Sequence, residues 1–510
     1  MTRHAAPIAT ALAIALLVAS CEVGPNYSRP TAPVPTSYKE LKGWKPATPR
    51  DAGANRPWWS IYRDPTLDKL ERQIDISNQN LKVAEAAYRQ AQALVAQARS
   101  QLYPTAAING SAQRSGPLGP TQNPAAAFAA GRGNIGTQNQ FNLTGSASWM
   151  PDIWGKVRRT VESQEANAQA SAADIAAARL SAQTTLATDY FTLRATDEQK
   201  RLLDTAVVAF TESLKITQNQ FAVGNAALSA VLQAKTQLEQ TQSQAIGTGV
   251  ARRQLEHAIA VLTGTPPGDF SIAVAPMPSY VPVVPAGMPS ALLERRPDIA
   301  AAERTMQAAN AQIGVAVAAY YPDVTLSASL GVASAMLGDL FTASSAAWAI
   351  GSSVSETVFD AGLREAQVAA ARALYEQDIA TYRQTVLTAF QQVEDQLAAL
   401  RILAEQAVAE DATVKDAREA ERLTLNQYLA GTVAYTSVII AQTTALTNEE
   451  SALTILQNRL IASVSLISAL GGGWTMTALP RESEIKGTPA AGAPIEETSP
   501  SLLHELLPFL

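Results

Sequence analysis

The chain of 510 residues is short of the residue types on which most enzymes depend. It has one cysteine and three histidines, and His257 is the one histidine that lies away from both ends of the chain. A single cysteine cannot form an internal disulfide. No cluster of metal ligands and no nucleophile with a neighbouring base is visible in the sequence. We therefore expect a protein that is not an enzyme and that holds neither a metal nor a cofactor.

Charge and aromatic residues are also sparse. Only 16% of the residues are charged, the net charge is −6, and the sequence has no run of Lys or Arg. Because nucleic-acid binding requires a basic surface against the phosphates, nucleic acid is excluded as a partner. Aromatic residues make up 6% of the chain, whereas alanine and glutamine are frequent. This composition is typical of long, closely packed helices.

The first 20 residues form an apolar leader. Arg3 and His4 precede the run "AAPIATALAIALLVAS", which is typical of a secretory signal peptide. Cys21 follows "VAS" directly, as in the lipobox of a bacterial lipoprotein. We expect Cys21 to be lipidated and to become the mature N-terminus. An ordinary cleavage site next to an incidental cysteine is the alternative.

Two periodicities alternate along the rest of the chain. From Leu81 to Leu102 apolar residues recur in steps of three and four, which predicts a coiled-coil-like helix that ends at Pro104. The segment "FNLTGSASW" instead alternates apolar or glycine residues with polar ones from Phe141 to Trp149, which predicts a strand with one dry and one wet face. Similar alternation occurs in "TAAINGSAQ", "DVTLSASLGV" and "WAIGSSVSETVF".

The same order of elements occurs twice, which indicates a tandem duplication. Three pairs of glycines share one spacing of about 207 residues, namely Gly155 with Gly362, Gly224 with Gly431, and Gly264 with Gly471. The predicted segments are a signal peptide (1–20), an extended strap (21–57), repeat 1 (58–268), a Pro-rich linker (269–289), repeat 2 (290–474) and a mobile C-terminal tail (475–510).

Four short two-faced strands cannot form a stable open sheet, because the apolar face needs hydrocarbon and the edges need partners. A bilayer accepts strands only as a closed barrel, and four strands from each of three chains would give twelve. Aromatic residues near the strand ends are then expected at the membrane interfaces, with core packing as the alternative for each. They are Tyr103, Phe141, Trp149, Tyr321, Trp348 and Phe359.

With these motifs the sequence resembles the TolC-like outer-membrane channel lipoproteins of tripartite (RND-type) efflux systems, in the nodulation-type, OprM-like group. The resemblance spans the chain from Cys21 to Trp474. It rests on "CEVGPNY", "WW", "LLERRPDIAAAER", "YYPDVTLSASLG", "VFDAGLR" and "ALGGGW". It implies an α+β membrane protein of the bacterial outer membrane, lipid-anchored, in which a homotrimer forms a 12-stranded transmembrane β-barrel continuous with a long periplasmic α-helical barrel.

The resemblance further implies a passive exit duct for small molecules that works with a periplasmic adaptor protein and an inner-membrane RND-type pump. The helix-turn-helix points at Gly224, Asn225, Gly431 and Thr432 would be the periplasmic tips that contact the adaptor. Two alternatives remain. One is a channel for protein secretion, and the other is a lipid-anchored periplasmic coiled-coil scaffold, which leaves the two-faced strands unexplained.

One stretch departs from the family pattern. Many members carry aspartate after the tip glycine of the second repeat, where acids ring the closed aperture. Here the corresponding positions hold Ser437 and Ile440, and in the first repeat they hold Ala230 and Gln233. We therefore expect a constriction that is polar and apolar rather than acidic, with Gln233, Tyr428, Ser437 and Ile440 near it; packing of Ile440 between helices is the alternative.

Overall fold

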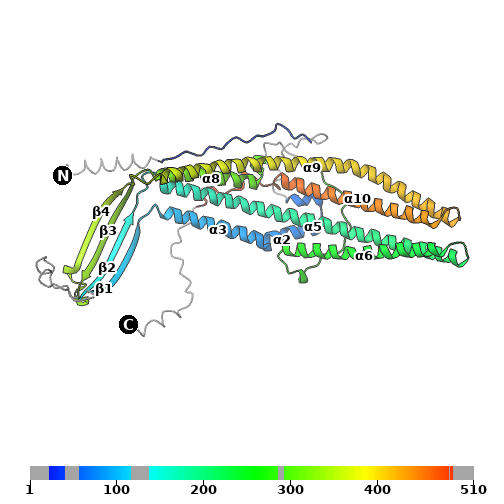
Figure 1. Cartoon of the computed structure of the whole chain (residues 1–510), viewed down its shortest axis with the longest axis horizontal. Coiled ribbons are helices and arrows are strands. Elements are labelled where there is room, and N and C mark those ends of the chain that lie inside the picture. Colours follow the sequence, from blue (N-terminus) through cyan, green and yellow to red (C-terminus); the bar gives the residue numbers. More distant parts are fainter. Residues whose placement is uncertain (1–21, 41–56, 117–136, 285–291, 482, 486–510) are drawn as a thin grey trace.

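The computed structural model describes residues 22–40, 57–116, 137–284, 292–481 and 483–485. The molecule is elongated, with a sheet at one end and helical hairpins at the other (Figure 1). The helices are α2 (Pro65–Ser77), α3 (Gln79–Ser100), α5 (Lys156–Ala222), α6 (Leu228–Leu262), α7 (Leu292–Arg295), α8 (Pro297–Ala318), α9 (Leu363–Leu429) and α10 (Tyr435–Ala469). The strands are β1 (Thr105–Ser115), β2 (Gln138–Trp149), β3 (Asp323–Ser334) and β4 (Ala346–Ser355).

The second half of the chain repeats the first. Helices α5 and α9 each have 67 residues, and α6 and α10 each have 35. Both ends of each helix are displaced by 207 residues from those of its counterpart. Gly155 and Gly362, at the N-caps of the two 67-residue helices, both have a left-handed backbone, with φ of 80° and 87°. The strand and helix order expected for each repeat is therefore present.

The strands form one antiparallel sheet in the order β1-β2-β3-β4. Strand β1 pairs only with β2, and β4 pairs only with β3, within the part of the chain that the structure describes. Each of these outer strands therefore leaves one row of backbone hydrogen-bonding groups without a strand partner in the protomer.

Like the strands of the sheet, the long helices lie side by side in one layer, which we call the wall and which has two edges. Next to the sheet α3 contacts α5, α5 contacts α8, and α8 contacts α9 (Figure 1). Toward the hairpins α6 contacts α5, α5 contacts α10, and α10 contacts α9. Helices α3 and α6 thus lie at one edge of the wall and α9 lies at the other. A single chain forms an open segment of a wall rather than a closed bundle.

The main core lies at mid-length, where α2 and the connecting segments cover the long helices. Tyr190, Phe191 and Tyr382 are fully buried there. An ion network fixes the segment that follows α6. Arg252 donates to the backbone carbonyl of Ile272 at 2.7 Å, and the carboxylate of Glu256 accepts from the amide of the same residue at 2.7 Å. The start of the connection between the two repeats is therefore held on α6, the helix from which it departs.

The segment after Trp474 differs in part from the predicted mobile tail. Ile485 is fully buried against Val95 and Ala168, and Gln169 donates to the carbonyl of Pro480 at 3.2 Å. The described residues of this segment therefore pack on α3 and α5. The remainder of the predicted tail lies outside the described residues.

Glu71 is a buried acid on α2 with an expected effect on pH dependence. It is fully buried, and neither carboxylate oxygen has a hydrogen-bond partner. Burial, assisted by the charge of Asp75, raises the pKa of Glu71 from 4.5 to about 9. Between these values the folded chain holds a proton that the unfolded chain releases, so stability falls as the pH rises from about 4.5 to about 9, by about 1.4 kcal/mol per pH unit.

Glu71→Gln should remove this dependence, because glutamine keeps the size of the side chain and does not titrate. We expect the gain in thermal stability over the parent protein to grow from pH 5 to pH 8, measured by the loss of helical circular dichroism on heating. Glu85→Gln, at an exposed position on α3, is the control. A constant difference between Glu71→Gln and the parent across this range would show that Glu71 is ionised in the folded chain.

Candidate functional site

The sheet has one apolar and one polar face. Directly paired residues share a face, and Leu143 lies opposite both Gly110 and Val332. The apolar face carries Ala106, Ile108, Ala112, Phe141, Ala147, Trp149, Val324, Leu326, Ala328, Leu330, Trp348, Ile350 and Val354. The opposite face carries Thr105, Asn109, Ser111, Asn142, Thr144, Ser146, Ser148, Thr325, Ser327, Ser329 and Ser353. The predicted alternation is therefore present in β1, β2 and β3, whereas β4 carries Ala347 and Ala349 on the polar face and Ser352 on the apolar face.

The apolar face is uncovered in the protomer. Ile350 is 77% exposed, and Ile108 and Trp348 are exposed to a similar degree. An apolar surface of this kind on a sheet is unstable in water and stable against hydrocarbon. The arrangement can therefore serve as a membrane-facing surface whose other face is wet.

The six aromatic residues proposed for the membrane interfaces lie at or near strand ends, and Trp348 is the third residue of β4. Trp149 donates from its indole N–H to the carbonyl of Leu102 at 3.0 Å. Tyr103 and Phe359 are exposed, and Phe141 is half-buried at the far end of β2. None of the six side chains is buried, which argues against core packing.

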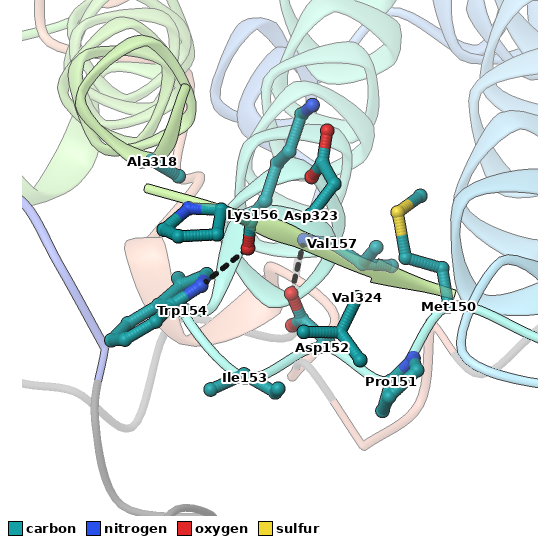
Figure 2. Close-up of a pocket in the computed structure, with 11 residues that line it drawn as sticks. Met150, Pro151, Asp152, Ile153, Trp154, Lys156, Val157, Ala318, Asp323 and Val324 are labelled. Atoms are coloured by element: carbon teal, nitrogen blue, oxygen red, sulfur yellow. Dashed lines mark hydrogen bonds between the residues drawn. The ribbon is translucent and has the colours of Figure 1, made fainter. Parts of the chain in front are cut away.

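Hydrogen bonds join the sheet to the start of α5 (Figure 2). Asp152 accepts hydrogen bonds from the amides of Val157 and Arg158, both at 2.9 Å, and so caps α5. Trp154 donates to the carbonyl of Pro322 at 2.9 Å. The ring of Trp154 also stacks on that of Tyr321. The end of β2 and the start of β3 are therefore fixed to the first turn of the 67-residue helix.

The first residues after Cys21 are bound at the same junction. Arg159 is buried and donates to the side chain of Asn26 at 2.8 Å and to the carbonyl of Val23 at 3.3 Å. Gly24 has φ of 98°, and a Cβ there would lie 2.5 Å from the Cα of Gly314. The segment therefore requires glycine at this position. Cys21 itself lies outside the described residues.

The two helix-turn-helix points lie at the end of the molecule opposite the sheet (Figure 1). Gly224 and Gly431 have φ of 81° and 73°. The amide of Asn225 donates to the carbonyl of Gln220 at 2.8 Å, and the amide of Thr432 makes the equivalent bond at 3.0 Å. These are Schellman turns, which need a left-handed residue. An added Cβ would meet no atom within 4 Å at either glycine, so the requirement for glycine is conformational and not steric.

Near the tips the two hairpins of one chain are joined by buried polar and aromatic residues. Tyr428 and Tyr435 are 6% and 5% exposed, and their ring centres are 5.2 Å apart. The hydroxyl of Tyr428 donates to that of Thr217 at 3.4 Å, and Gln442 donates to the hydroxyl of Ser213 at 3.0 Å. The expectation that Tyr428 lines a constriction is therefore wrong for this conformation, because its ring is enclosed between the hairpins.

The other candidate constriction residues are accessible. Ile440 is 67% exposed, Gln233 is exposed and Ser437 is half-buried. The alternative that Ile440 packs between helices does not hold within the protomer. Sequence reasoning missed Ser213 and Gln442, because a polar residue on a long helix is normally expected to face water. Short polar residues recur four positions apart on α5, and this spacing was the sequence signal that could have indicated a buried polar contact.

The described residues contain no group of three or more His, Cys, Asp or Glu side chains that could hold a metal ion. His257 is exposed on α6. Helix α10 is long and apolar enough to cross a membrane, but it packs lengthwise against α9 and α5. Its apolar residues therefore belong to the helical wall.

Comparisons with known proteins agree on one family. The family described as "Outer membrane efflux protein" matches residues 71–265 and 288–472. The probable efflux pump outer membrane protein TtgC of Pseudomonas putida is 28% identical, over 90% of this chain and 94% of the relative. The cation efflux system protein CusC of Escherichia coli is 27% identical, over 90% and 97%. The solved structure of the outer-membrane channel OprN superposes with a TM-score of 0.81 at 27% identity, over 89% and 100%.

The two faces of the sheet predict opposite effects of an added charge. Leu143→Arg or Leu326→Arg places a cation on the apolar face, where lipid contact near the midplane costs about 2–4 kcal/mol. Asn142→Arg or Thr325→Arg, one residue earlier on the polar face, should be tolerated. The yield of folded protein in the outer membrane, measured by resistance to unfolding in mild detergent, compares the two pairs. Equal losses in both pairs would contradict the assignment of the faces.

Proposed function

The chain belongs to the outer membrane efflux protein family, and from this premise we propose that three copies form the passive exit duct of a tripartite efflux pump in the outer membrane. The observation that carries the proposal is the four-stranded sheet, which has an uncovered apolar face and two strands without an outer partner. Three such sheets joined edge to edge would form a closed barrel of twelve strands and leave no edge unpaired.

The helical wall supports the same closure. The edges of the wall match the edges of the sheet. Helices α3 and α6 lie at the edge that corresponds to β1, and α9 lies at the edge that corresponds to β4. Three walls would then continue the barrel into a tube. The polar face of the sheet, with Asn142, Thr144 and Ser146 on β2, would line a watery passage. A periplasmic scaffold would leave the apolar face of the sheet exposed to water.

The proposed cargo is small molecules, and the proposed partners are a periplasmic adaptor and an inner-membrane RND-type pump. The names of the relatives TtgC and CusC assign those proteins to efflux systems. Two hairpins per chain give six similar tips in a trimer, which suit a ring-shaped adaptor. Asn225 and Thr432, whose amides complete the two turns, are exposed beside the glycines and available for that contact. The duct itself uses no cofactor and carries out no chemistry.

The gate is placed at the tips, where Ile440, Ser437 and Gln233 would form a constriction without acidic residues. The exposure of Ile440 supports this placement, because its side chain is accessible on α10 whereas Val438, two residues earlier, is fully buried. In a trimer each acidic residue at the constriction would occur three times, and such a ring would concentrate negative potential and attract multivalent cations. A ring of isoleucine, serine and glutamine would not.

The lipid anchor is proposed at Cys21. Glu22 and Val23 are held at the junction of sheet and helices, where Glu22 lies 3.4 Å from the guanidinium of Arg159 and the amide of Val23 donates to the carbonyl of Trp154 at 3.2 Å. A mature chain that began at Cys21 would therefore begin one residue before a segment that is held beside the sheet. A lipid attached there can enter the membrane without a long linker.

Mass spectrometry of the N-terminal peptide tests this anchor. We expect a peptide that begins at Cys21 and carries covalently bound acyl chains. Cys21→Ser should remove the acyl mass but leave channels in the membrane, because the barrel is a much larger attachment than one lipid. A mature chain that starts elsewhere, or an unmodified Cys21, would exclude the lipoprotein assignment.

Single-channel recording in planar bilayers tests the duct and its constriction together. The parent protein should conduct with weak cation preference and with little block by multivalent cations added on the periplasmic side. Ile440→Asp should create such block, because it places three acids close together. Val208→Asp, which adds the same charge at an exposed position of α5 farther from the tip, should not.

The outcomes of this recording separate two claims. Absence of any conductance from the parent would contradict the exit duct. Strong multivalent block of the parent would show that another acidic ring exists, and it would contradict only the placement of the gate.

A further inference from the structure

In repeat 1 a buried carboxylate ties the two helices of the hairpin together. Arg252 of α6 donates from its Nε atom to the carboxylate of Asp197 on α5 at 2.7 Å. Arg194, one turn before Asp197 on α5, donates to the same carboxylate at 3.2 Å. Asp197 is only 5% exposed, so the contact is shielded from water. One acid thus satisfies two arginines and joins α5 to α6.

Repeat 2 keeps the two arginines and lacks this acid. At a displacement of 207 residues they return as Arg401 on α9 and Arg459 on α10. Ala404 stands at the position of Asp197. Arg401 instead donates to the carboxylate of Glu40, in the extended strap, at 2.6 Å. Helices α9 and α10 therefore lack the carboxylate that ties α5 to α6.

Arg459 is left with a buried donor that has no acceptor. Ser463 stands at the position of Glu256, which is the second acid that contacts Arg252 in repeat 1. The Nε atom of Arg459 is buried and has no hydrogen-bond partner within the described part of the chain. A guanidinium N–H that is shielded from water and lacks an acceptor costs free energy, which an anionic acceptor would recover.

The guanidinium of Arg459 lines a cavity of about 470 Å³. The walls of the cavity come from α5, α9, α10 and the connection between the repeats. Leu202, Met277, Leu453 and Leu456 supply apolar side chains to the lining. A volume of this size and a mainly apolar lining with few polar groups are typical of sites for small organic molecules.

The other arginines that line the cavity are already paired. Arg201 forms an ion pair with Glu198 at 2.5 Å, and Arg418 forms one with Glu449. Ten residues of α10 separate Glu449 from Arg459, which corresponds to about 15 Å along the helix. The cavity is therefore elongated, with paired charges toward one end and the unpaired cation at the other.

Two further acids, Glu410 and Asp411 of α9, also line the cavity. Neither forms an ion pair with Arg459 in the described structure, whose Nε atom remains without an acceptor. The position that an acid occupies in repeat 1 is thus open in repeat 2, although acids lie elsewhere in the same lining.

We propose that this cavity binds a small organic carboxylate with an apolar body, whose carboxylate accepts a hydrogen bond from the Nε atom of Arg459. The carboxylate takes the role that Asp197 has in repeat 1, and the apolar body lies against Leu453 and Leu456. A ligand bound in this way ties α9 to α10 as Asp197 ties α5 to α6. The inference does not depend on the proposed duct, because it rests on contacts within one chain.

Calorimetric titration of the full chain in lipid nanodiscs tests the ligand class. The probe is 3-phenylpropionate, and the controls are 3-phenylpropanol, which lacks the carboxylate, and acetate, which lacks the apolar body. We expect saturable binding of the probe and binding about tenfold weaker or less for each control, because each control lacks one half of the interaction. No binding of the probe, or equal binding of 3-phenylpropanol, would overturn the proposal.

Three variants test the place of binding. Arg459→Gln should lose binding of 3-phenylpropionate, whereas Arg201→Gln, which removes the same charge toward the other end of the cavity, should retain it. Ala404→Asp should supply the acid within the chain, so it should raise the unfolding temperature without ligand and prevent binding of the probe. Unchanged affinity in Arg459→Gln would show that the site lies elsewhere. Unchanged affinity in Ala404→Asp would do so too, even where Arg459→Gln does not fold.

Discussion

The structure depends on one unmet requirement, which is that the four-stranded sheet must cover its apolar face and complete its two edges. No helix of the described chain lies on this sheet, because the helices extend away from it (Figure 1). Water cannot satisfy an apolar face that carries Ile108, Trp348 and Ile350, and a bilayer cannot accept an open edge. Closure with further copies satisfies both needs at once. The long helices follow the same closure, because each continues from a strand through a capped junction.

The duplication explains why one chain can supply two helical hairpins that end at the same level. The long helices of the two repeats have equal length, so both hairpin tips reach the same level, and the Schellman turns at Gly224 and Gly431 end both helices in the same way. The two units are not chemically identical. Tyr428 and Tyr435 are replaced by Phe221 and Leu228 in the other repeat.

Much of this architecture could be predicted from the sequence, because strands and helices with a dry face leave regular patterns. The alternation in "FNLTGSASW" identified β2 and its apolar face, and the glycine spacing identified the repeat. The burial of Tyr428 and of Glu71 could not be predicted. A 67-residue helix meets different neighbours along its length, so its apolar positions do not show which of them meet the same chain and which meet a copy. The buried bond between Ser213 and Gln442 was missed as well, because polar residues on a helix are ordinarily expected to face water.

The central claim is that the sheet is a segment of a closed barrel. Electron microscopy of the purified protein in a lipid nanodisc tests it most directly. We expect three copies around one axis, a closed sheet of twelve strands with Ile350 facing lipid, and a continuous helical tube below it. Any other number of copies, an open sheet, or an apolar face covered by protein instead of lipid would contradict it.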